Sequence, residues 1–384
     1  MKHTSSIELS KSSYKKNLSY LQKRIGKAKF VSVIKGNAYG HGIEQFLPMA
    51  ESCGVDYFAV FNAYEAERAL SAKQPETTIM IMGMIENDEL QWAIENGLTF
   101  YVFNRERLDS ALKYAKKSGR KARIHIEIET GLNRTGFEEY ELEYVAELIN
   151  NNRKFFSVEG ICTHYAGAES VANYRRILDQ IQCFKRIKRQ LKTLNIQAKY
   201  YHSACSAAAL TYPKTIMNMV RIGIAQYGFW PSKETKMYNI LTANKKKMKD
   251  PLRRVLKWKS SIMDLKDVSP GEFISYGNSY LTEKRKRIAS VPVGYGNGYS
   301  RNLSNTGHVL VKGRKAPVMG LINMNMFLID VTGIKDISIG DEVVLIGRQK
   351  SQTITVASFI EYSNHVNYEL LTRLPPDIPR TVTS

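Results

Sequence analysis

The chain has 384 residues, a length that favours two domains, and it shows neither a secretory signal nor a run of about 18 apolar residues, so we expect a cytoplasmic protein without a membrane partner. Its 4 cysteines stand far apart without a CxxC pair, which indicates reduced thiols and gives no sign of a zinc or other metal site, or of a disulfide framework. The formal net charge of +20 would suit a polyanion-binding protein, but the basic residues are spread along the chain without a zinc-finger, RNP or basic-zipper pattern, so we expect no nucleic-acid partner.

Short runs rich in β-branched and aromatic residues recur through the first 224 residues. They cover residues 29–35, 57–61, 78–82, 99–103, 122–128, 156–162, 198–202 and 218–224. Helix-like stretches lie between several of them, at residues 62–73, 87–97, 104–119 and 170–194. Regular alternation of strand and helix predicts an α/β fold, a (β/α)8 TIM-like barrel, whose catalytic residues lie at the carboxyl ends of the strands.

The pattern changes after residue 242. Short alternating runs replace the strand and helix pairs, at residues 255–265, 287–294, 308–313, 316–322, 326–331 and 341–347, and a short helix is expected over 355–363. We therefore predict two domains, a barrel over residues 1–242 and a mostly-β C-terminal domain over residues 243–384.

Several residues capable of chemistry stand at or near the ends of the predicted strands. They are Lys35, Arg134, His164, His202, Ser206 and Arg221. In a barrel these six side chains would converge on one mouth. Each alone has a structural alternative, since a lone histidine is more often structural, Arg221 could belong to a buried ion pair and Ser206 could cap a helix.

Lys35 is the most unusual of the six. It follows the apolar run 30–34 and precedes a glycine-rich turn, whereas a structural lysine belongs on a solvated helix face. A lysine, a serine at a helix start and amides next to glycines together suit a cofactor that carries an aldehyde and a phosphate. Pyridoxal 5′-phosphate has both groups.

A series of motifs in order along the chain carries a family resemblance. They are VIKGNAYGHG, THYAG, HSACSAA, RIGIAQYG, ISYGNSY, VGYGNGYSR and the C-terminal IPR. With these motifs the sequence resembles the alanine racemase family over nearly its whole length. The resemblance implies a pyridoxal-phosphate-dependent isomerase that interconverts L- and D-alanine for D-alanine biosynthesis.

The resemblance also implies a role for two bases. Lys35 would hold the cofactor and face the D-side of the substrate α-carbon, and Tyr276, in the C-terminal domain, would face the L-side. Racemisation needs a base on each face, because the proton leaves from one side and returns on the other. In the family this tyrosine reaches the cofactor of the partner subunit, so we expect a homodimer with shared sites.

Further site residues come with the resemblance. The phosphate would be bound by Tyr39, Ser206 and the backbone N–H groups of Gly223 and Ile224. Arg221 would face the pyridine nitrogen, supported by His164 and His202, while the amino-acid substrate would contact Arg134, Met324 and Tyr295.

The sequence departs from the family pattern at several positions. Glu127 stands where the family commonly has a lysine, often carbamylated, that orients the arginine corresponding to Arg134, and Glu129 stands at an aspartate position. We therefore expect Glu127 to hold Arg134 as an anion that needs no carbon dioxide.

Other departures concern the substrate pocket. Asn323 and Asn325 flank Met324 where the family has cysteine and aspartate, and Pro376 replaces a tyrosine. These changes keep a broad-specificity amino-acid racemase, acting on serine or larger side chains, as an alternative. A non-catalytic pyridoxal-phosphate carrier is a second alternative, against which a domain carrying Tyr276 counts, and a polyanion-binding protein is a third.

Overall fold

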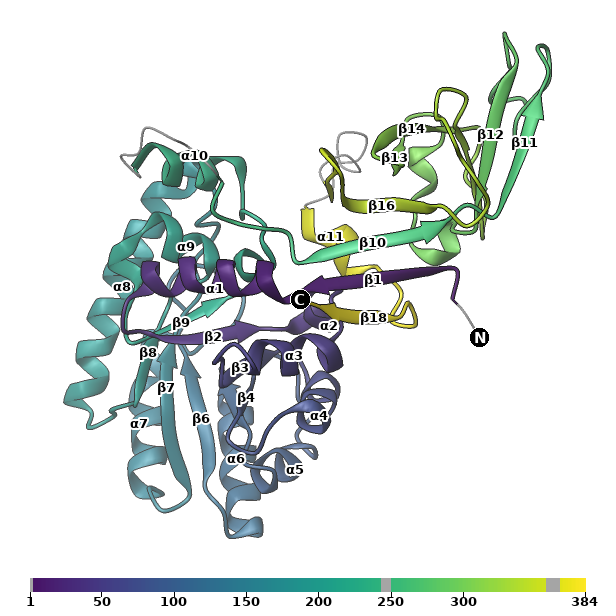
Figure 1. Cartoon of the computed structure of the whole chain (residues 1–384). Coiled ribbons are helices and arrows are strands. Elements are labelled where there is room, and N and C mark those ends of the chain that lie inside the picture. The colour runs from purple at the N-terminus through teal and green to yellow at the C-terminus, as the bar shows by residue number, and fades with distance from the viewer. Residues whose placement is uncertain (1–2, 243–249, 357–366) are drawn as a thin grey trace. The chain divides into compact units, whose positions relative to one another are not determined.

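The computed structural model describes residues 3–242, 250–356 and 367–384. The chain divides into two compact units, each built from separate segments. The barrel unit contains residues 13–36 and 47–253, and the β unit contains residues 1–12, 37–46 and 254–384. Each unit has its own sheet (Figure 1).

Parallel strands form the barrel unit, in the order β8-β7-β6-β5-β4-β3-β2-β9. Their bounds are β2 (Lys29–Val33), β3 (Tyr57–Val60), β4 (Thr78–Ile81), β5 (Thr99–Val102), β6 (Ala122–Glu127), β7 (Phe156–Cys162), β8 (Tyr200–His202) and β9 (Met219–Ile222). Each of the eight runs predicted from the sequence contains one of these strands, which confirms the barrel. Most of these strands are buried on both faces, as parallel strands covered by helices must be.

The barrel is nearly closed between β8 and β9. The side chain of Asn218 joins them, since its Oδ1 accepts from the backbone N–H of Tyr201 at 2.6 Å and its Nδ2 donates to the carbonyl of Lys199 at 2.8 Å. Farther along, the N–H of Arg221 donates to the carbonyl of Ala204 at 3.1 Å. One side-chain amide thus supplies bonds that a strand ladder would otherwise make.

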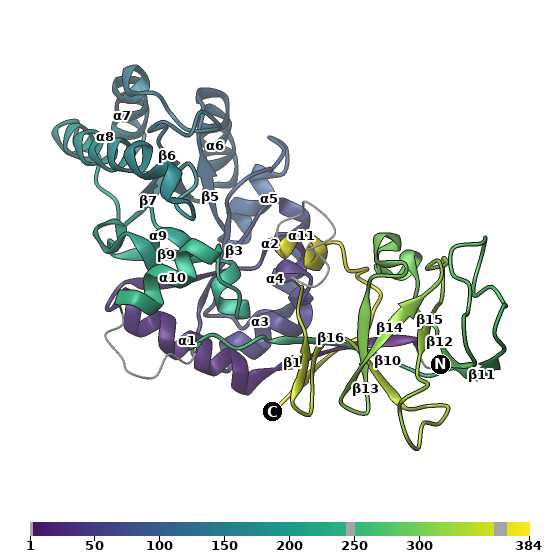
Figure 2. The same cartoon turned by 90° about the horizontal axis from the view of Figure 1, so that it is seen from above.

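Helices follow the strands and surround them (Figures 1 and 2). Their bounds are α1 (Lys11–Ile25), α3 (Ile43–Glu51), α4 (Ala63–Ala72), α5 (Leu90–Glu95), α6 (Arg105–Ser118), α7 (Leu142–Asn151), α8 (Tyr174–Thr193), α9 (Ser206–Thr211) and α10 (Lys233–Thr242), with 3-10 turns η1 (Glu139–Glu141), η2 (Val171–Asn173), η3 (Pro213–Thr215) and η4 (Ile224–Tyr227). The four predicted helical stretches correspond to α4, α5, α6 and α8, whereas α1, α3, α7 and α10 were not predicted. Asn104 caps α6 by accepting from the N–H of Arg107 at 2.9 Å, and Gly119 ends it in a left-handed conformation.

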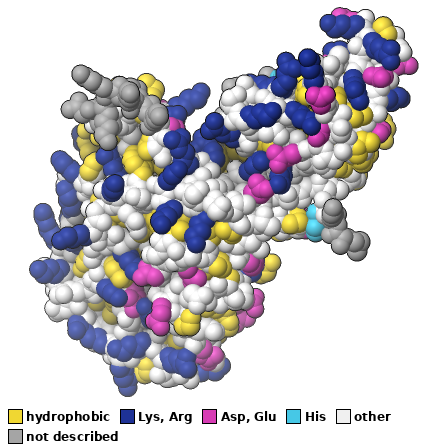
Figure 3. Space-filling model, in the orientation of Figure 1, with side chains coloured by type: hydrophobic (Ala, Val, Ile, Leu, Met, Phe, Trp, Pro, Cys, Tyr) yellow, Lys and Arg dark blue, Asp and Glu magenta, His cyan; other side chains and the backbone are white. Residues whose placement is uncertain are grey.

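The long helix α8 explains part of the positive charge. It buries Ile177, Phe184 and Leu191 at helical spacing and turns Lys185 and Arg189 toward solvent. Figure 3 shows lysines and arginines scattered over the visible face of both units, with carboxylates among them. This distribution is typical of solvated helix faces and loops.

The short helix α2 (Lys35–Tyr39) has an unusual hand. Its residues from Gly36 to Tyr39, and Gly40 after them, have φ angles of 63°, 53°, 54°, 51° and 79°. An L-amino acid in a left-handed turn costs roughly 1–2 kcal/mol, and three of the five are not glycine. The turn therefore has to be held by its surroundings.

Within the β unit, the C-terminal segment holds this turn. Nε of Arg380 donates to the carbonyl of Gly40 at 3.0 Å, and its other nitrogens donate to the carbonyls of Pro375, Pro376 and Ile378. A β-carbon on Gly40 would lie 1.9 Å from a backbone oxygen of residue 371, so only glycine fits there.

The β unit is built on a mixed sheet that, in the described ranges, runs β11-β12-β15-β14-β13-β16-β10-β1-β18, with β17 beside β16. Its elements are β1 (Ser5–Ser10), β10 (Leu256–Ser261), β11 (Asp264–Val268), β12 (Lys286–Val291), η5 (Tyr295–Asn297), η6 (Arg301–Leu303), β13 (His308–Val311), β14 (Arg314–Met319), β15 (Phe327–Asp330), β16 (Glu342–Gln349), β17 (Gln352–Ile354), α11 (Asn367–Thr372) and β18 (Arg380–Thr383). The predicted alternating runs correspond to β10–β16, whereas β1, β17 and β18 were not predicted. The helix predicted over 355–363 falls almost wholly outside the described residues.

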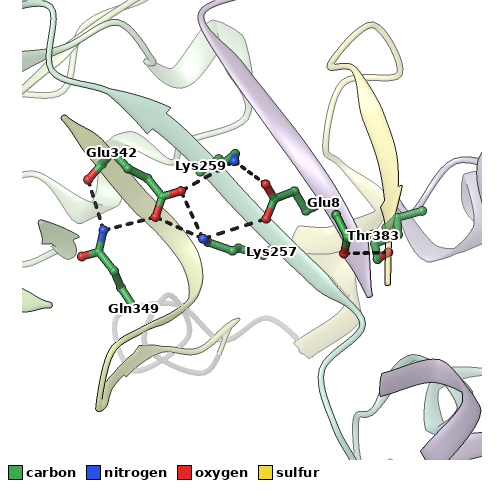
Figure 4. Close-up of polar contacts among 7 residues, drawn as sticks. Glu8, Lys257, Lys259, Glu342, Gln349 and Thr383 are labelled. Atoms are coloured by element: carbon green, nitrogen blue, oxygen red, sulfur yellow. Dashed lines mark hydrogen bonds and ion pairs between the residues drawn. The ribbon is translucent and has the colours of Figure 1, made fainter. Parts of the chain in front are cut away.

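Strand β1 is paired antiparallel with β10 and parallel with β18. Charged side chains reinforce this pairing, as Figure 4 shows: Glu8 pairs with Lys259, and Glu342 accepts from Lys257 at 3.1 Å. Lys259 also lies 3.6 Å from Glu342, so alternating charges link β1, β10 and β16. Cross-strand pairs of opposite charge stabilise a sheet modestly.

No helix in the part of the chain that the structure describes is long and apolar enough to cross a bilayer. The 4 cysteines are unpaired.

Candidate active site

Lys35 lies just beyond β2 in the barrel unit. Within the described ranges, no side-chain or backbone group forms a hydrogen bond or ion pair with its amine. The amine is reached by solvent but largely surrounded by protein, and this partial desolvation, together with the positive charge of Arg134, lowers the pKa of Lys35 against the opposing effect of Glu65. A lowered pKa increases the fraction of neutral amine, the form that attacks an aldehyde.

Glu65 holds the peptide next to Lys35. One of its carboxylate oxygens accepts from the N–H of Gly36 at 2.6 Å, and the other accepts from the N–H of Phe61 at 2.9 Å. Glu65 belongs to α4, and Asn62 caps this helix by accepting from the N–H of Glu65. Glu65 was not predicted from the sequence, although Asn-x-x-Glu after a strand is a signal of a helix start.

Arg221 is buried, with only 5% of its surface exposed, and lies in β9. Its Nη1 donates to Nδ1 and to the carbonyl of His202, and its Nη2 donates to the carbonyls of Thr163 at 2.9 Å and Ser203 at 3.3 Å. Nδ1 of His164 lies 3.4 Å from Nη2. Nε has no partner among the described residues, so one donor of the fork stays available.

His164 and His202 are both neutral. Burial, and then the charge of Arg221, lowers the pKa of His164 to about 3 and the pKa of His202 well below its ordinary value. A neutral imidazole can accept from a guanidinium, which a cationic imidazole cannot do. The predicted support of Arg221 by two histidines therefore agrees with their charge state.

Ser206 begins α9 and lies beside the loop after β9. Its hydroxyl oxygen accepts from the backbone N–H of Gly223 at 2.9 Å and of Ala225 at 3.4 Å. The N–H of Ile224, between them, has no partner in the described part of the chain. Ser206, Gly223 and Ile224, predicted from distant parts of the sequence, are thus brought together. Tyr39 lies in the β unit, where its ring packs edge-on against the ring of Tyr368, with the two ring centroids 6.1 Å apart.

These groups fit pyridoxal 5′-phosphate by their chemistry. Among the described residues these groups have no partner: the amine of Lys35 suits an aldehyde, Nε of Arg221 suits a ring nitrogen that accepts, and the N–H of Ile224 beside Ser206 suits a phosphate oxygen.

The loop after β6 carries Arg134 and two glutamates. Burial opposes ionisation of Glu129, but bonds from the backbone N–H groups of Gly131, Asn133 and their neighbours lower its pKa below the ordinary value. Glu129 therefore shapes the loop as an anion, through backbone bonds that include the N–H of Arg134 at 3.3 Å.

Glu127 is used differently from the prediction. Its carboxylate accepts from the hydroxyl of Thr135 at 2.8 Å, and, within the residues that the structure describes, no hydrogen bond or ion pair joins it to Arg134. The predicted hydrogen bond between them is therefore not made, although the charge of Arg134 acts on Glu127 and opposes the rise of its pKa. Glu127 ends β6 with its side chain 96% covered, and burial, opposed by the bond from Thr135, raises its pKa.

The β unit presents three predicted residues at its surface. Tyr276 is 70% exposed, Met324 57% and Tyr295 42%. The backbone N–H of Tyr295 donates to the carbonyl of Asn323 at 3.0 Å, which joins the loops of Tyr295 and Met324. Asn325 is exposed on the same loop. Exposure of an aromatic residue and a methionine together is typical of a surface that another molecule covers.

Two family models match the chain. The N-terminal domain of alanine racemase matches residues 9–231 and the C-terminal domain of alanine racemase matches residues 255–382. A curated relative, alanine racemase 1 of Caldanaerobacter subterraneus subsp. tengcongensis, is 34% identical over 366 residues, which is 95% of this chain and 91% of that protein.

Solved structures agree in fold. Alanine racemase from D-cycloserine-producing Streptomyces lavendulae superposes with a TM-score of 0.89 at 28% identity, covering 100% of this chain and 98% of that chain. Alanine racemase from Bacillus anthracis, solved with bound L-Ala-P, gives 0.88 at 29% identity, covering 100% and 96%. With both domain models matched in order and the barrel and β unit in place, the chain belongs to the alanine racemase family.

Proposed function

We propose that this protein is a pyridoxal-phosphate-dependent alanine racemase that interconverts L- and D-alanine. The observation that supports this most strongly is the arrangement at the barrel mouth in a chain of this family. There the amine of Lys35 and Nε of Arg221 have no partner among the described residues, and Ser206 lies beside the backbone N–H groups that follow β9. When bound, the cofactor withdraws electrons from the α-carbon of an amino acid and so makes its α-proton acidic.

Two residues would move the proton. Lys35 would take or return it at the D-face and Tyr276 at the L-face. Two bases are needed because one base can reach only one side of a planar carbon. The lowered pKa of Lys35 supports its part, since it eases release of the ammonium proton.

Arg221 would donate from Nε to the pyridine nitrogen. Arginine does not release its proton at ordinary pH, so that nitrogen would stay unprotonated. The ring would then be a weaker electron sink, which favours simple return of the proton over side reactions. Ser206 and the N–H groups of Gly223 and Ile224 would bind the phosphate with Tyr39, and Arg134, Met324 and Tyr295 would contact the substrate.

A homodimer with shared sites is part of the proposal. The exposure of Tyr276, Met324 and Tyr295 on the β unit supports it, because a catalytic tyrosine that is 70% exposed needs a second surface to shield its chemistry from water. Residues 1–242 and 243–384 stay the predicted limits of the cofactor-binding and second-base domains. The cytoplasmic location and the role in D-alanine biosynthesis also stay predictions.

The preferred substrate is proposed to be alanine, as the names of the relatives suggest. Asn323, Asn325 and Pro376 keep the broad-specificity alternative open. A racemisation assay with added pyridoxal phosphate, comparing kcat/KM for alanine, serine and lysine, tests both. Alanine preferred by several orders of magnitude would remove the alternative, comparable values would support it, and no racemisation of any amino acid would contradict the proposed function.

A further inference from the structure

Buried hydrogen bonds lead from Arg221 into the interior of the barrel unit. Nη1 of Arg221 contacts Nδ1 of His202, and Nε2 of His202 lies 2.9 Å from Nδ1 of His125. On its other side, Nε2 of His125 lies 3.1 Å from the hydroxyl oxygen of Tyr57. Both histidines are fully buried and Tyr57 is 4% exposed. Neither His125 nor Tyr57 has a place in the proposed proton transfers.

This series of hydrogen bonds, called the hydrogen-bond chain below, continues to a backbone group. The hydroxyl oxygen of Tyr57 lies 3.2 Å from Oγ1 of Thr99, and that hydroxyl donates to the carbonyl of Ile79 at 3.3 Å. Thr99 is fully buried. The residues of the hydrogen-bond chain belong to β9, β8, β6, β3, β5 and β4, so the bonds cross the barrel interior and do not follow a single strand.

The arginine end fixes the direction of every bond. A guanidinium only donates, so Nδ1 of His202 must accept, and the proton of that ring must be on Nε2. Nε2 then donates to Nδ1 of His125, which places the proton of His125 on its Nε2 as well. His125 therefore donates to Tyr57, whose hydroxyl proton is left to point at Thr99.

The backbone end imposes the same direction independently. The carbonyl of Ile79 only accepts, so the single hydroxyl proton of Thr99 is used there and Thr99 must accept from Tyr57. Tyr57 has then donated its own proton and can only accept from His125. Arg221 and Ile79 thus require the same tautomer in both histidines.

Both histidines have to be neutral for this arrangement. A cationic His125 would carry protons on both nitrogens and would face the proton on Nε2 of His202. Burial, and then the charge of Arg221, lowers the pKa of His125 to about 3, and the pKa of His202 is also well below its ordinary value.

We infer that His125 and Tyr57 are positioning residues for Arg221, and that this one-way hydrogen-bond chain fixes the accepting tautomer of His202 and so the orientation of the guanidinium. The inference rests on the proposed role of Arg221 opposite the cofactor ring. Without the hydroxyl of Tyr57, His125 could hold its proton on Nδ1 and donate to His202. His202 would then present an N–H to Nη1 of Arg221, and the two donors would move apart.

The structure supplies a matched control. Tyr101 is a buried tyrosine whose ring centroid lies 6.0 Å from that of His125 and 6.2 Å from that of His202. Its hydroxyl contacts no member of the hydrogen-bond chain; the thiol of Cys162 is the polar group beside it, and no other partner lies within hydrogen-bond geometry in the described part of the protein. Tyr101→Phe therefore removes a hydroxyl beside the same two rings without breaking the hydrogen-bond chain, whereas Tyr57→Phe breaks that hydrogen-bond chain. Both substitutions keep an aromatic ring in place.

The first measurement uses the cofactor-free protein. With 15N-labelled histidine, the signals of His125 and His202 can be identified among the 7 histidines by their loss in His125→Gln and His202→Gln. We expect both rings to carry the proton on Nε2 and none on Nδ1, unchanged between pH 6 and 8. Tyr57→Phe should shift these signals or make them exchange between tautomers, and Tyr101→Phe should leave them in place. A proton on Nδ1 of His202 in the wild type would overturn the inference.

The second measurement uses the holoenzyme. We expect Tyr57→Phe to lower kcat about tenfold while KM for alanine changes less than about twofold, because a displaced supporting group mainly misplaces the reacting geometry. Tyr101→Phe should stay within about twofold of the wild type. Equal effects of the two substitutions, or a Tyr57→Phe enzyme with unaltered tautomers and kcat, would overturn the inference.

Thr99 provides a second pair of variants should Tyr57→Phe fail to fold. Thr99→Val removes the final donor and Thr99→Ser retains it, so only valine should disturb the histidine signals and lower kcat, and equal behaviour of the two would contradict the inference. A wild-type protein that racemises no amino acid would contradict the proposed function instead. The tautomer measurement on the cofactor-free protein would still decide whether the hydrogen-bond chain exists.

Discussion

The hydroxyl of Ser275 donates a hydrogen bond of 2.7 Å to the carbonyl oxygen of Leu321, and Ser275 comes directly before Tyr276. Ser275 has a φ of 69°, a left-handed conformation that costs a residue with a β-carbon on the order of 1–3 kcal/mol. Its hydroxyl also lies 3.4 Å from Oδ1 of Asn323. The backbone that carries the proposed L-face base is therefore held by a side-chain bond to a neighbouring loop.

Replacing Ser275 by alanine should displace Tyr276. We expect a loss of about tenfold in kcat/KM and of about 1 kcal/mol in the free energy of unfolding, because one hydrogen bond is lost and the left-handed conformation is retained. The deuterium isotope effect should rise more with α-deuterated L-alanine than with the D-enantiomer. Ser279→Ala, an exposed serine of the same loop, is the control. Equal kinetics for the two variants would remove Ser275 from the positioning of Tyr276.

Replacing Lys35 by alanine should prevent covalent attachment of the cofactor. We expect no borohydride-reducible absorbance from bound pyridoxal phosphate, since no other lysine in the described part of the barrel unit lies at the carboxyl end of a strand. Lys29→Ala changes a lysine at the start of β2, the strand that precedes Lys35; Lys29 is paired with Asp56 at 2.6 Å, and this variant should retain attachment. Wild-type absorbance in the Lys35 variant would show that another lysine holds the cofactor.

Activity should not depend on carbon dioxide. Glu127 occupies the position of the family's carbamylated lysine and already carries a carboxylate, so dialysis without bicarbonate should leave kcat unchanged. Recovery of activity on adding bicarbonate would point to a modified lysine elsewhere. Because Glu127 bonds Thr135 and not Arg134, Glu127→Gln should change KM for alanine less than about threefold, since an amide oxygen can still accept from Thr135.

Complementation tests the shared sites. Homodimers of Lys35→Ala and of Tyr276→Phe should each be nearly inactive, yet subunit exchange should yield mixed dimers with one intact site. Random association makes about half of the dimers mixed, so activity should recover to about a quarter of the wild-type value per subunit. An inactive mixture, once mass spectrometry has shown exchange, would mean that Tyr276 serves its own subunit or is not the base.

The buried histidines should make the fold sensitive to acid. Burial lowers the pKa of His125, His164 and His41 to about 3, whereas unfolded histidine titrates near 6.5. The unfolded chain therefore binds more protons, and stability is lost as the pH falls from about 6.5 toward 3, by about 1.4 kcal/mol per pH unit for each such histidine. Urea unfolding at pH 7, 6 and 5 measures this. His125→Gln should reduce the slope and the exposed His308→Gln should not.

The barrel was predictable because its strands are local and strongly patterned. Six polar residues at or near strand ends could be predicted for the same reason, since parallel strands place their carboxyl ends together. Strand β1 was missed because its pairing with β10 joins residues about 250 positions apart, and SSIELS carries little strand signal of its own.

The missed site residues show where sequence reasoning stops. His125 and Tyr57 lie within predicted strands, and only the closed barrel shows that the side chain of His125 meets both His202 and Tyr57. Glu127 was assigned to Arg134 by analogy, but the path of a short side chain decides its partner, and that partner is Thr135. Polar residues in strands that are buried on both faces are the signal that could have indicated the hydrogen-bond chain.

The left-handed turn after Lys35 has a consequence for the order in which the protein is made. Its non-glycine residues prefer the opposite hand; His41 contacts the carbonyls of Ala38 and Tyr39 locally, but the bond to the carbonyl of Gly40 comes from Arg380, 340 residues away in the sequence. Synthesis proceeds from the N-terminus, so the barrel strands can emerge and pair while this partner has not yet been translated. The segment that carries Tyr39 therefore gains its bond to Arg380 only after residue 380 has been made, and a chain that ends before that residue would have a barrel whose turn after the lysine is held by local bonds without the one from Arg380.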